Sequence, residues 1–180
     1  FTTEELEETI KGLANGKAAG RDGISAEMYK LLWEEEWVRE AFLWVMNGCY
    51  GAGKTPESWS KLVVSVLYKK GDPTDPANYR PISITGVDYK IQSRMLATRL
   101  NKSMSYLIGD HQVGFVHGRL IFDNIGLVQA ALEGEEGTVH FSDFAQAFPS
   151  VPHNFIIGAL QASKFPPKFI GMVEAYHKQV

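Results

Sequence analysis

The amino-acid sequence predicts a helix-rich α+β fold with a short strand hairpin and one further strand. Apolar residues recur at helical spacing over most of the chain. Two extended runs, 62–68 and 79–84, flank a segment containing Gly and Pro, which is typical of paired strands. A further run, 138–142, predicts a buried strand that ends at Asp143.

The composition is that of a globular protein. Hydrophobic residues make up 44% of the 180 residues and charged residues 22%. The longest strongly apolar stretch, 41–46, is too short to span a membrane. A single cysteine, Cys49, excludes an internal disulfide. Because no basic-then-apolar leader opens the chain, we expect an intracellular location, with the nucleus as one candidate compartment.

The net charge of -3 hides an uneven distribution. Residues 1–50 carry a net charge of -5, residues 51–120 carry +5 and residues 121–180 carry -3. A basic middle segment suits an anionic partner, because the local field concentrates phosphate. Ordinary variation between surface segments is the alternative, and charge alone does not separate the two.

The first third of the chain is predicted to be helical. Thr2 and Glu5 form a capping box before a helix that ends near Gly16. Ser25 is expected to cap a second helix, and a third covers about 36–50. The tryptophans are predicted to belong to the core: Trp33, Trp37, Trp44 and Trp59.

The remainder continues with the hairpin and further helices. Pro81 lacks an N–H, so its strand lies at a sheet edge or begins after it. Helical patterns follow at 87–107, 121–132, 151–162 and 167–178.

Two sets of polar side chains could carry chemistry. Asp143 would stand at the end of a buried strand, a common way to hold a catalytic or metal-binding acid rigidly. A helix N-cap is the alternative, and spacing alone favours it. Lys69 and Lys70 are predicted to lie on a tight turn at 69–73, and Arg80 begins the return strand, so the three cations could bind a phosphate. A solvated turn is the alternative there.

Other catalytic patterns are absent from the sequence. The glycine-containing loop 16–23 lacks the spacing of a phosphate-binding P-loop, and the five histidines are too scattered for a zinc site. Ser150 and His153 could be combined with Asp143 as a hydrolase triad, but Ser150 has no Gly-x-Ser-x-Gly elbow.

Seven blocks in the same order resemble the first half of a reverse transcriptase of the non-LTR retrotransposon (LINE) type. They lie at 16–24, 59–72, 78–83, 89–91, 96–100, 112–119 and 142–148, so the resemblance covers nearly the whole chain. It implies the fingers and partial palm of a right-hand polymerase. The implied parts are a helical N-terminal extension or fingers region at 1–60, fingers with the basic hairpin at 61–135, and the start of the palm at 136–180.

The resemblance also implies roles for individual residues. Asp143 would bind catalytic Mg²⁺, and Phe148 would screen the sugar 2′ position of the incoming nucleotide. Lys69 or Lys70, together with Arg80, would contact the triphosphate of a deoxynucleoside triphosphate. A block associated with RNA template and DNA primer contains Gln112, Gly114, Phe115 and Arg119.

The sequence also departs from the family pattern. Pro149 follows Phe148 where aspartate is usual, Ala19 replaces a proline, and Gln146 replaces a common lysine. An aromatic–x–Asp–Asp motif, the second acidic motif of the palm, does not occur in the 180 residues. We therefore expect this chain alone not to polymerise. A non-catalytic nucleic-acid-binding module and a degenerate remnant are the alternatives.

Overall fold

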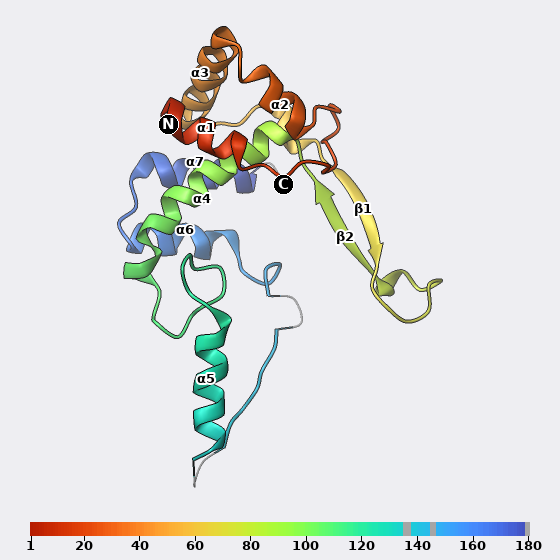
Figure 1. The fold of residues 1–180 in the computed structure, drawn as a ribbon, viewed down its shortest axis with the longest axis vertical. Coiled ribbons are helices and arrows are strands. Elements are labelled where there is room, and N and C mark those ends of the chain that lie inside the picture. The colour runs from red at the N-terminus through yellow and green to blue at the C-terminus, as the bar shows by residue number, and fades with distance from the viewer. Residues whose placement is uncertain (135–137, 145–146, 179–180) are drawn as a thin grey trace. The chain divides into compact units, whose positions relative to one another are not determined.

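The computed structural model describes residues 1–134, 138–144 and 147–178 (Figure 1). These residues form two compact units. One unit contains 1–96 together with 166–178, and the other lies within 97–165. The predicted boundary between fingers and palm, at residues 135 and 136, lies outside the described residues and stays a prediction. In the described part of the chain no helix is both long enough and apolar enough to cross a bilayer.

The discontinuous unit begins with three helices. Helix α1 (Thr3–Lys11) starts at the predicted capping box, in which the Thr2 hydroxyl accepts from the amide of Glu5 and the Glu5 carboxylate accepts from the amide of Thr2. Helix α2 (Ala26–Leu32) follows Ser25, whose side chain makes no capping hydrogen bond, and helix α3 spans Glu36–Ala52.

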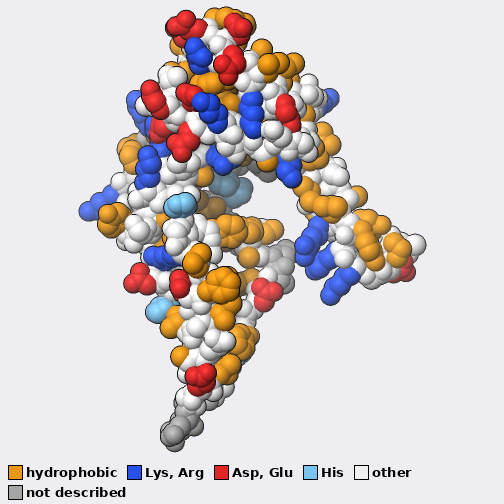
Figure 2. All heavy atoms as spheres, viewed as in Figure 1, with side chains coloured by type: hydrophobic (Ala, Val, Ile, Leu, Met, Phe, Trp, Pro, Cys, Tyr) orange, Lys and Arg blue, Asp and Glu red, His pale blue; other side chains and the backbone are white. Residues whose placement is uncertain are grey.

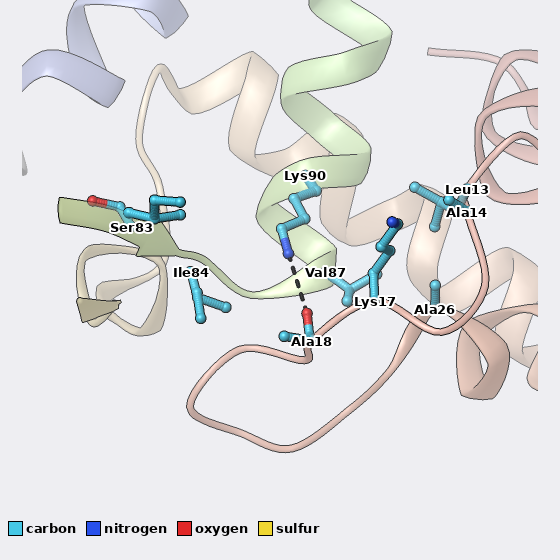
Figure 3. Close-up of a pocket in the computed structure, with 10 residues that line it drawn as sticks. Leu13, Ala14, Lys17, Ala18, Ala26, Ser83, Ile84, Val87 and Lys90 are labelled. Atoms are coloured by element: carbon cyan, nitrogen blue, oxygen red, sulfur yellow. Dashed lines mark hydrogen bonds between the residues drawn. The ribbon is translucent and has the colours of Figure 1, made fainter. Parts of the chain in front are cut away.

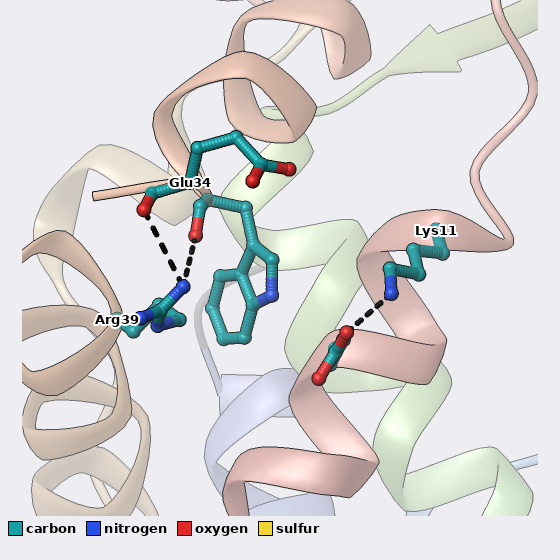
Figure 4. Close-up of polar contacts among 5 residues, drawn as sticks. Lys11, Glu34 and Arg39 are labelled. Atoms are coloured by element: carbon teal, nitrogen blue, oxygen red, sulfur yellow. Dashed lines mark hydrogen bonds and ion pairs between the residues drawn. The ribbon is translucent and has the colours of Figure 1, made fainter. Parts of the chain in front are cut away.

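Hydrogen bonds and an ion pair stabilise these helices locally (Figure 4). Arg39 on α3 donates through Nη1 to the carbonyls of Trp33, at 3.1 Å, and Glu34, at 3.4 Å. These bonds supply donors to carbonyl groups of the two residues that follow α2. On α1, Lys11 pairs with Glu7 one turn earlier.

The core of this unit includes side chains of α1, α3, the start of α4 (Val87–Leu107) and α7 (Pro167–Lys178). Ile91, Met46 and Met172 are completely buried there. Gln92 is also buried: its Nε2 donates to the Met46 carbonyl at 2.9 Å, and its Oε1 accepts from the Tyr176 hydroxyl at 2.8 Å. One side chain therefore links α4 to both neighbouring helices.

We expect Tyr176→Phe to lower the free energy of unfolding by about 1 kcal/mol, because the buried Gln92 oxygen would lose its donor. Burial raises the pKa of the Tyr176 hydroxyl well above its ordinary value, so it stays protonated as a donor. Urea unfolding of the full chain measures the loss. Tyr106→Phe is the matched control, because the Tyr106 side chain is 90% exposed. An equal effect of both variants would contradict the prediction.

The predicted hairpin is confirmed. Strands β1 (Val63–Tyr68) and β2 (Tyr79–Ile84) pair antiparallel, from Val63 opposite Ile84 to Tyr68 opposite Tyr79. Within the described residues the sheet has only these two strands, so each has a free edge, and Pro81 is tolerated opposite Val66. Figure 1 shows the hairpin extending away from the helices of its unit.

The second unit contains the end of α4, helix α5 (Ile121–Leu132) and helix α6 (His153–Ala162). The strand predicted at 138–142 is wrong, because residues 138–144 have no regular secondary structure and Phe141 is 72% exposed. A strand requires a partner for its backbone N–H and C=O groups. In the described residues the only strand pairing is that of β1 with β2, and neither strand pairs with 138–144.

The expected burial of the tryptophans is half right. Trp33 and Trp59 are 5% exposed, whereas Trp37 and Trp44 are 68% and 77% exposed. Trp37 and Trp44 lie two turns apart on the same face of α3. Helical spacing places that face opposite Met46, the buried residue of α3.

Candidate nucleotide-binding site

The loop of the hairpin, residues 69–78, is a structured segment rather than the tight turn predicted from the sequence. The Tyr68 hydroxyl donates to the Gly71 carbonyl at 2.6 Å, and the Tyr79 hydroxyl donates to the Pro73 carbonyl at 2.8 Å. Asn78 closes the loop by donating from Nδ2 to the Asp72 carbonyl at 2.9 Å. A short 3₁₀ helix, η2 (Pro76–Asn78), leads into β2.

Asp72 is a fixed negative charge in this loop. Its Oδ1 accepts from the amide of Thr74 at 2.8 Å and from the Thr74 hydroxyl at 2.7 Å. These hydrogen bonds hold the pKa of Asp72 below its usual value. The Asp72 carboxylate therefore stabilises the loop through its hydrogen bonds to Thr74.

Two of the predicted phosphate-binding cations share one face of the hairpin. The ladder continues one step past β1, because the Lys69 amide donates to the Asn78 carbonyl at 2.7 Å. Arg80 lies opposite Leu67, and alternation along the strand brings Lys69 to the face that carries Leu67. Lys70 follows at the start of the loop.

These three cations are exposed, and none of them takes part in an ion pair within the described chain. Figure 2 shows lysine and arginine side chains gathered along one edge of the hairpin. The hairpin thus offers positive charge to solvent from a hydrogen-bonded support.

We expect Gly71→Ala to disorder this loop at a cost of about 1 kcal/mol, because Gly71 has a φ of 96°. An added Cβ would also lie 2.8 Å from Nδ2 of Asn78, whose amide closes the loop. Faster hydrogen exchange of the amides of residues 69–78 would show the effect. Gly51→Ala is the matched control, since a Cβ at Gly51 meets no atom within 4 Å. Unchanged exchange in Gly71→Ala would contradict the prediction.

A pocket of about 370 Å³ lies at the base of the hairpin (Figure 3). Its walls are mainly apolar, and Lys17 and Lys90 add two cations. The Lys90 ammonium donates to the Ala18 carbonyl at 3.5 Å. Both lysines lie in blocks that carry the family resemblance, but no role was predicted for them, because their proximity depends on contact between loop 13–18 and α4.

The glycine-containing loop 16–23 has a packing role. A Cβ at Gly20 would lie 2.6 Å from Cα of Gly86, so the two backbones meet at a distance that only glycine permits. Beside this contact is a second pocket, of about 210 Å³, which contains Asp22 and Asp88 together with Arg21 and Lys61. Asp88 accepts from Nε1 of the buried Trp59 at 2.6 Å.

Asp143 is exposed within the irregular segment 138–144. The next described helix, α6, begins at His153 after Pro152, so Asp143 does not cap it and the N-cap alternative is wrong for that helix. In residues 1–134, 138–144 and 147–178 no group of three or more His, Cys, Asp or Glu side chains could hold a metal ion. Because one carboxylate supplies too few oxygen ligands, the described residues alone do not fit a divalent-metal centre.

Arg119 organises the loop between α4 and α5. Its guanidinium donates to the carbonyls of Gln112, at 2.8 Å, and Ile108, at 3.1 Å, and also to that of Gly109. It lies 3.5 Å from a carboxylate oxygen of Asp110. The Arg119 side chain is 17% exposed, so its donors act mainly within the loop.

Residues 68–179, more than half of the chain, match the family model described as reverse transcriptase (RNA-dependent DNA polymerase). The chain belongs to the reverse transcriptase family. The resemblance to the non-LTR retrotransposon type is confirmed by relatives from such elements.

Three relatives illustrate the similarity. The transposon TX1 uncharacterized 149 kDa protein of Xenopus laevis is 32% identical over 98% of this chain and 14% of its own length. The probable RNA-directed DNA polymerase from transposon BS of Drosophila melanogaster is 29% identical over 96% of this chain and 20% of its own length. The RNA-directed DNA polymerase from the mobile element jockey of Drosophila melanogaster is 29% identical over 97% of this chain and 20% of its own length. The chain therefore spans a fifth or less of these relatives.

In this reverse transcriptase segment the predicted site residues fall into two sets. The hairpin brings together Lys69, Lys70 and Arg80 in the discontinuous unit. The other unit contains Asp143, and it brings Phe115 to Phe148, with ring centroids 6.1 Å apart. Gln112 donates from Nε2 to the Gly114 carbonyl at 3.2 Å in the same loop.

Proposed function

We propose that this chain supplies the fingers and the start of the palm of an RNA-directed DNA polymerase that copies RNA into DNA. In this proposal, the basic hairpin binds the triphosphate of the incoming deoxynucleotide. The observation that carries the proposal is the hairpin itself, which presents exposed cations from a hydrogen-bonded loop within a reverse transcriptase chain.

The cation types suit this role. Arg80 has a planar guanidinium that can hold two phosphate oxygens at once, whereas Lys69 and Lys70 act as point charges. Phosphoryl transfer depends mainly on positioning and on neutralising the charge of the phosphates. Side chains that are exposed and outside ion pairs can meet a triphosphate without first breaking an internal contact.

Asp143 is proposed as one ligand of a divalent ion, Mg²⁺, in the complete polymerase. The ion would supply charge neutralisation at the reacting phosphate. Further oxygen ligands would have to come from residues other than those described. Phe148 is proposed to screen the sugar 2′ position. Gln112 and Gly114, in the loop held by Arg119, are proposed to meet the RNA template or the DNA primer.

A nucleic-acid-binding module without catalysis is the second candidate. It is favoured by the fact that the described residues contain no group of three or more His, Cys, Asp or Glu side chains that could hold a metal ion. The two candidates share the basic hairpin and differ in whether the chain contributes Asp143 to a reaction.

We expect the triple change of Lys69, Lys70 and Arg80 to Ala to weaken the binding of single-stranded RNA by the full chain. The slope of log affinity against log salt is negative, and each lost phosphate contact should lower its magnitude by about 0.7. Three lost contacts should therefore lower the magnitude by about 2. Fluorescence anisotropy of a labelled RNA at several salt concentrations measures this slope.

A matched control removes three lysines from helices α1 and α7: Lys11, Lys168 and Lys178. The total charge change is the same, so a slope that falls equally in both triple variants would mean that the hairpin has no specific role. A slope unchanged by the hairpin variant would reject RNA binding by the hairpin, which is the second candidate. The proposed nucleotide contact is tested by the KM of the complete polymerase for a deoxynucleoside triphosphate, which should rise in the hairpin variant and not in the control. An unchanged KM would reject the proposal.

A further inference from the structure

Phe115 has an unusual backbone conformation. Its φ is 61°, and in the described chain the only other non-glycine residue with a positive φ is Lys164. A bulky aromatic residue rarely adopts this left-handed conformation, because its Cβ crowds the backbone. Such a conformation persists only where the surrounding structure enforces it, and it is often found at functional sites.

The residues around Phe115 supply that enforcement. On the N-terminal side, Gln112 donates from Nε2 to the Gly114 carbonyl, and its own carbonyl accepts from Arg119 at 2.8 Å. Val113, 8% exposed, anchors the loop by burial. The loop is thus held on both sides of Phe115, while the Phe115 ring is 91% exposed.

The exposed Phe115 ring meets another aromatic side chain of its unit. The rings of Phe115 and Phe148 are 6.1 Å apart at an interplanar angle of 76°. This edge-to-face arrangement is attractive, because the positive edge of one ring meets the negative face of the other. The backbone of Phe148 is restricted by Pro149, whereas its ring, 79% exposed, has little other support.

We propose that Phe115 is a positioning residue that fixes the orientation of the Phe148 ring and thereby sets how strictly the polymerase excludes ribonucleotides. The inference rests on the proposed role of Phe148. A side chain can screen a hydroxyl group by steric exclusion only if it cannot rotate away. An edge-to-face contact with a ring on a rigid loop limits that rotation.

The test measures single-nucleotide incorporation by the complete polymerase, as the ratio of kcat/KM for a deoxynucleotide to that for the matching ribonucleotide. Phe115→Asn removes the ring but suits the backbone, since Asn tolerates positive φ. We expect this change to lower the ratio about two- to tenfold, the range associated with loss of one aromatic pair. Phe115→Tyr retains the ring and should retain the ratio.

Two further variants separate the inference from the role of Phe148. Phe148→Val should lower the ratio, and adding Phe115→Asn to it should lower the ratio no further, because the ring to be positioned is gone. Phe122→Asn, at a 72% exposed phenylalanine on α5, should leave the ratio unchanged.

The outcomes are distinguishable. If Phe148→Val lowers the ratio and Phe115→Asn does not, the positioning role of Phe115 is rejected and the role of Phe148 remains. The positioning role is also rejected if Phe115→Asn only weakens the affinity for primer and template at an unchanged ratio, or if the losses in the double variant add. If Phe148→Val leaves the ratio unchanged, the proposed role of Phe148 fails and the inference fails with it.

Discussion

Replacing Asp143 with Asn is expected to reduce primer extension by the complete polymerase by more than about 100-fold. The change preserves the shape of the side chain but removes the negative charge that a hard divalent ion requires. Loss of a residue that only supports metal ligands already costs about 10- to 100-fold, and a direct ligand should matter more. Extension of a labelled DNA primer on an RNA template measures the effect.

The same variant should bind RNA and unfold in urea like the unmodified protein, because Asp143 is exposed in an irregular segment. Asp123→Asn is the matched control, since Asp123 is an exposed aspartate on α5 in the same unit. Undiminished extension in Asp143→Asn would refute the ligand assignment. Equal losses in both variants would point to a general effect of charge in this unit.

The second large effect is expected in stability. Gly20→Val should lower the free energy of unfolding by about 3 kcal/mol, at the upper end of the cost of overpacking. The new Cβ would lie 2.6 Å from Cα and 2.7 Å from the backbone nitrogen of Gly86. Backbone atoms cannot rotate away as a flexible side chain can, so loop 16–23 would have to separate from the start of α4.

Urea unfolding of the full chain measures this change. Gly48→Val on α3 is the matched control, because a Cβ at Gly48 meets no atom within 4 Å. The control should be close to neutral, since valine and glycine are both modest helix formers. If Gly20→Val is as stable as the control, the close approach of Gly20 and Gly86 does not contribute to the fold.

Local patterns were sufficient to predict most elements of this chain. Helices α4 and α7 and both strands have the predicted ranges within about a residue, because periodicity and turn residues are properties of short segments. The segment 138–142 failed as a strand because the strand propensity of a short segment does not show whether a partner strand lies beside it. Trp37 and Trp44 were misplaced because composition does not show which face of a helix is buried.

Some residues of the candidate site could also be predicted from local sequence, and others could not. Lys69, Lys70 and Arg80 could be grouped from the sequence, because a hairpin joins neighbouring segments. The pocket with Lys17 and Lys90 could not be predicted from the sequence, because it depends on contacts between residues more than seventy positions apart. The bonds from Arg119 to carbonyl groups were also beyond prediction, since every residue has a carbonyl and only the folded loop selects three of them. The metal-binding role of Asp143 stays a prediction.

The return of α7 to the N-terminal helices has a consequence for synthesis on the ribosome. The ribosome must synthesise residues 97–165 before Met172 and Tyr176 can reach α3 and α4. Until then the Gln92 oxygen has no tyrosine donor. We therefore expect the first 96 residues to remain incompletely folded until α7 has been synthesised. Chaperones should be most needed during this period.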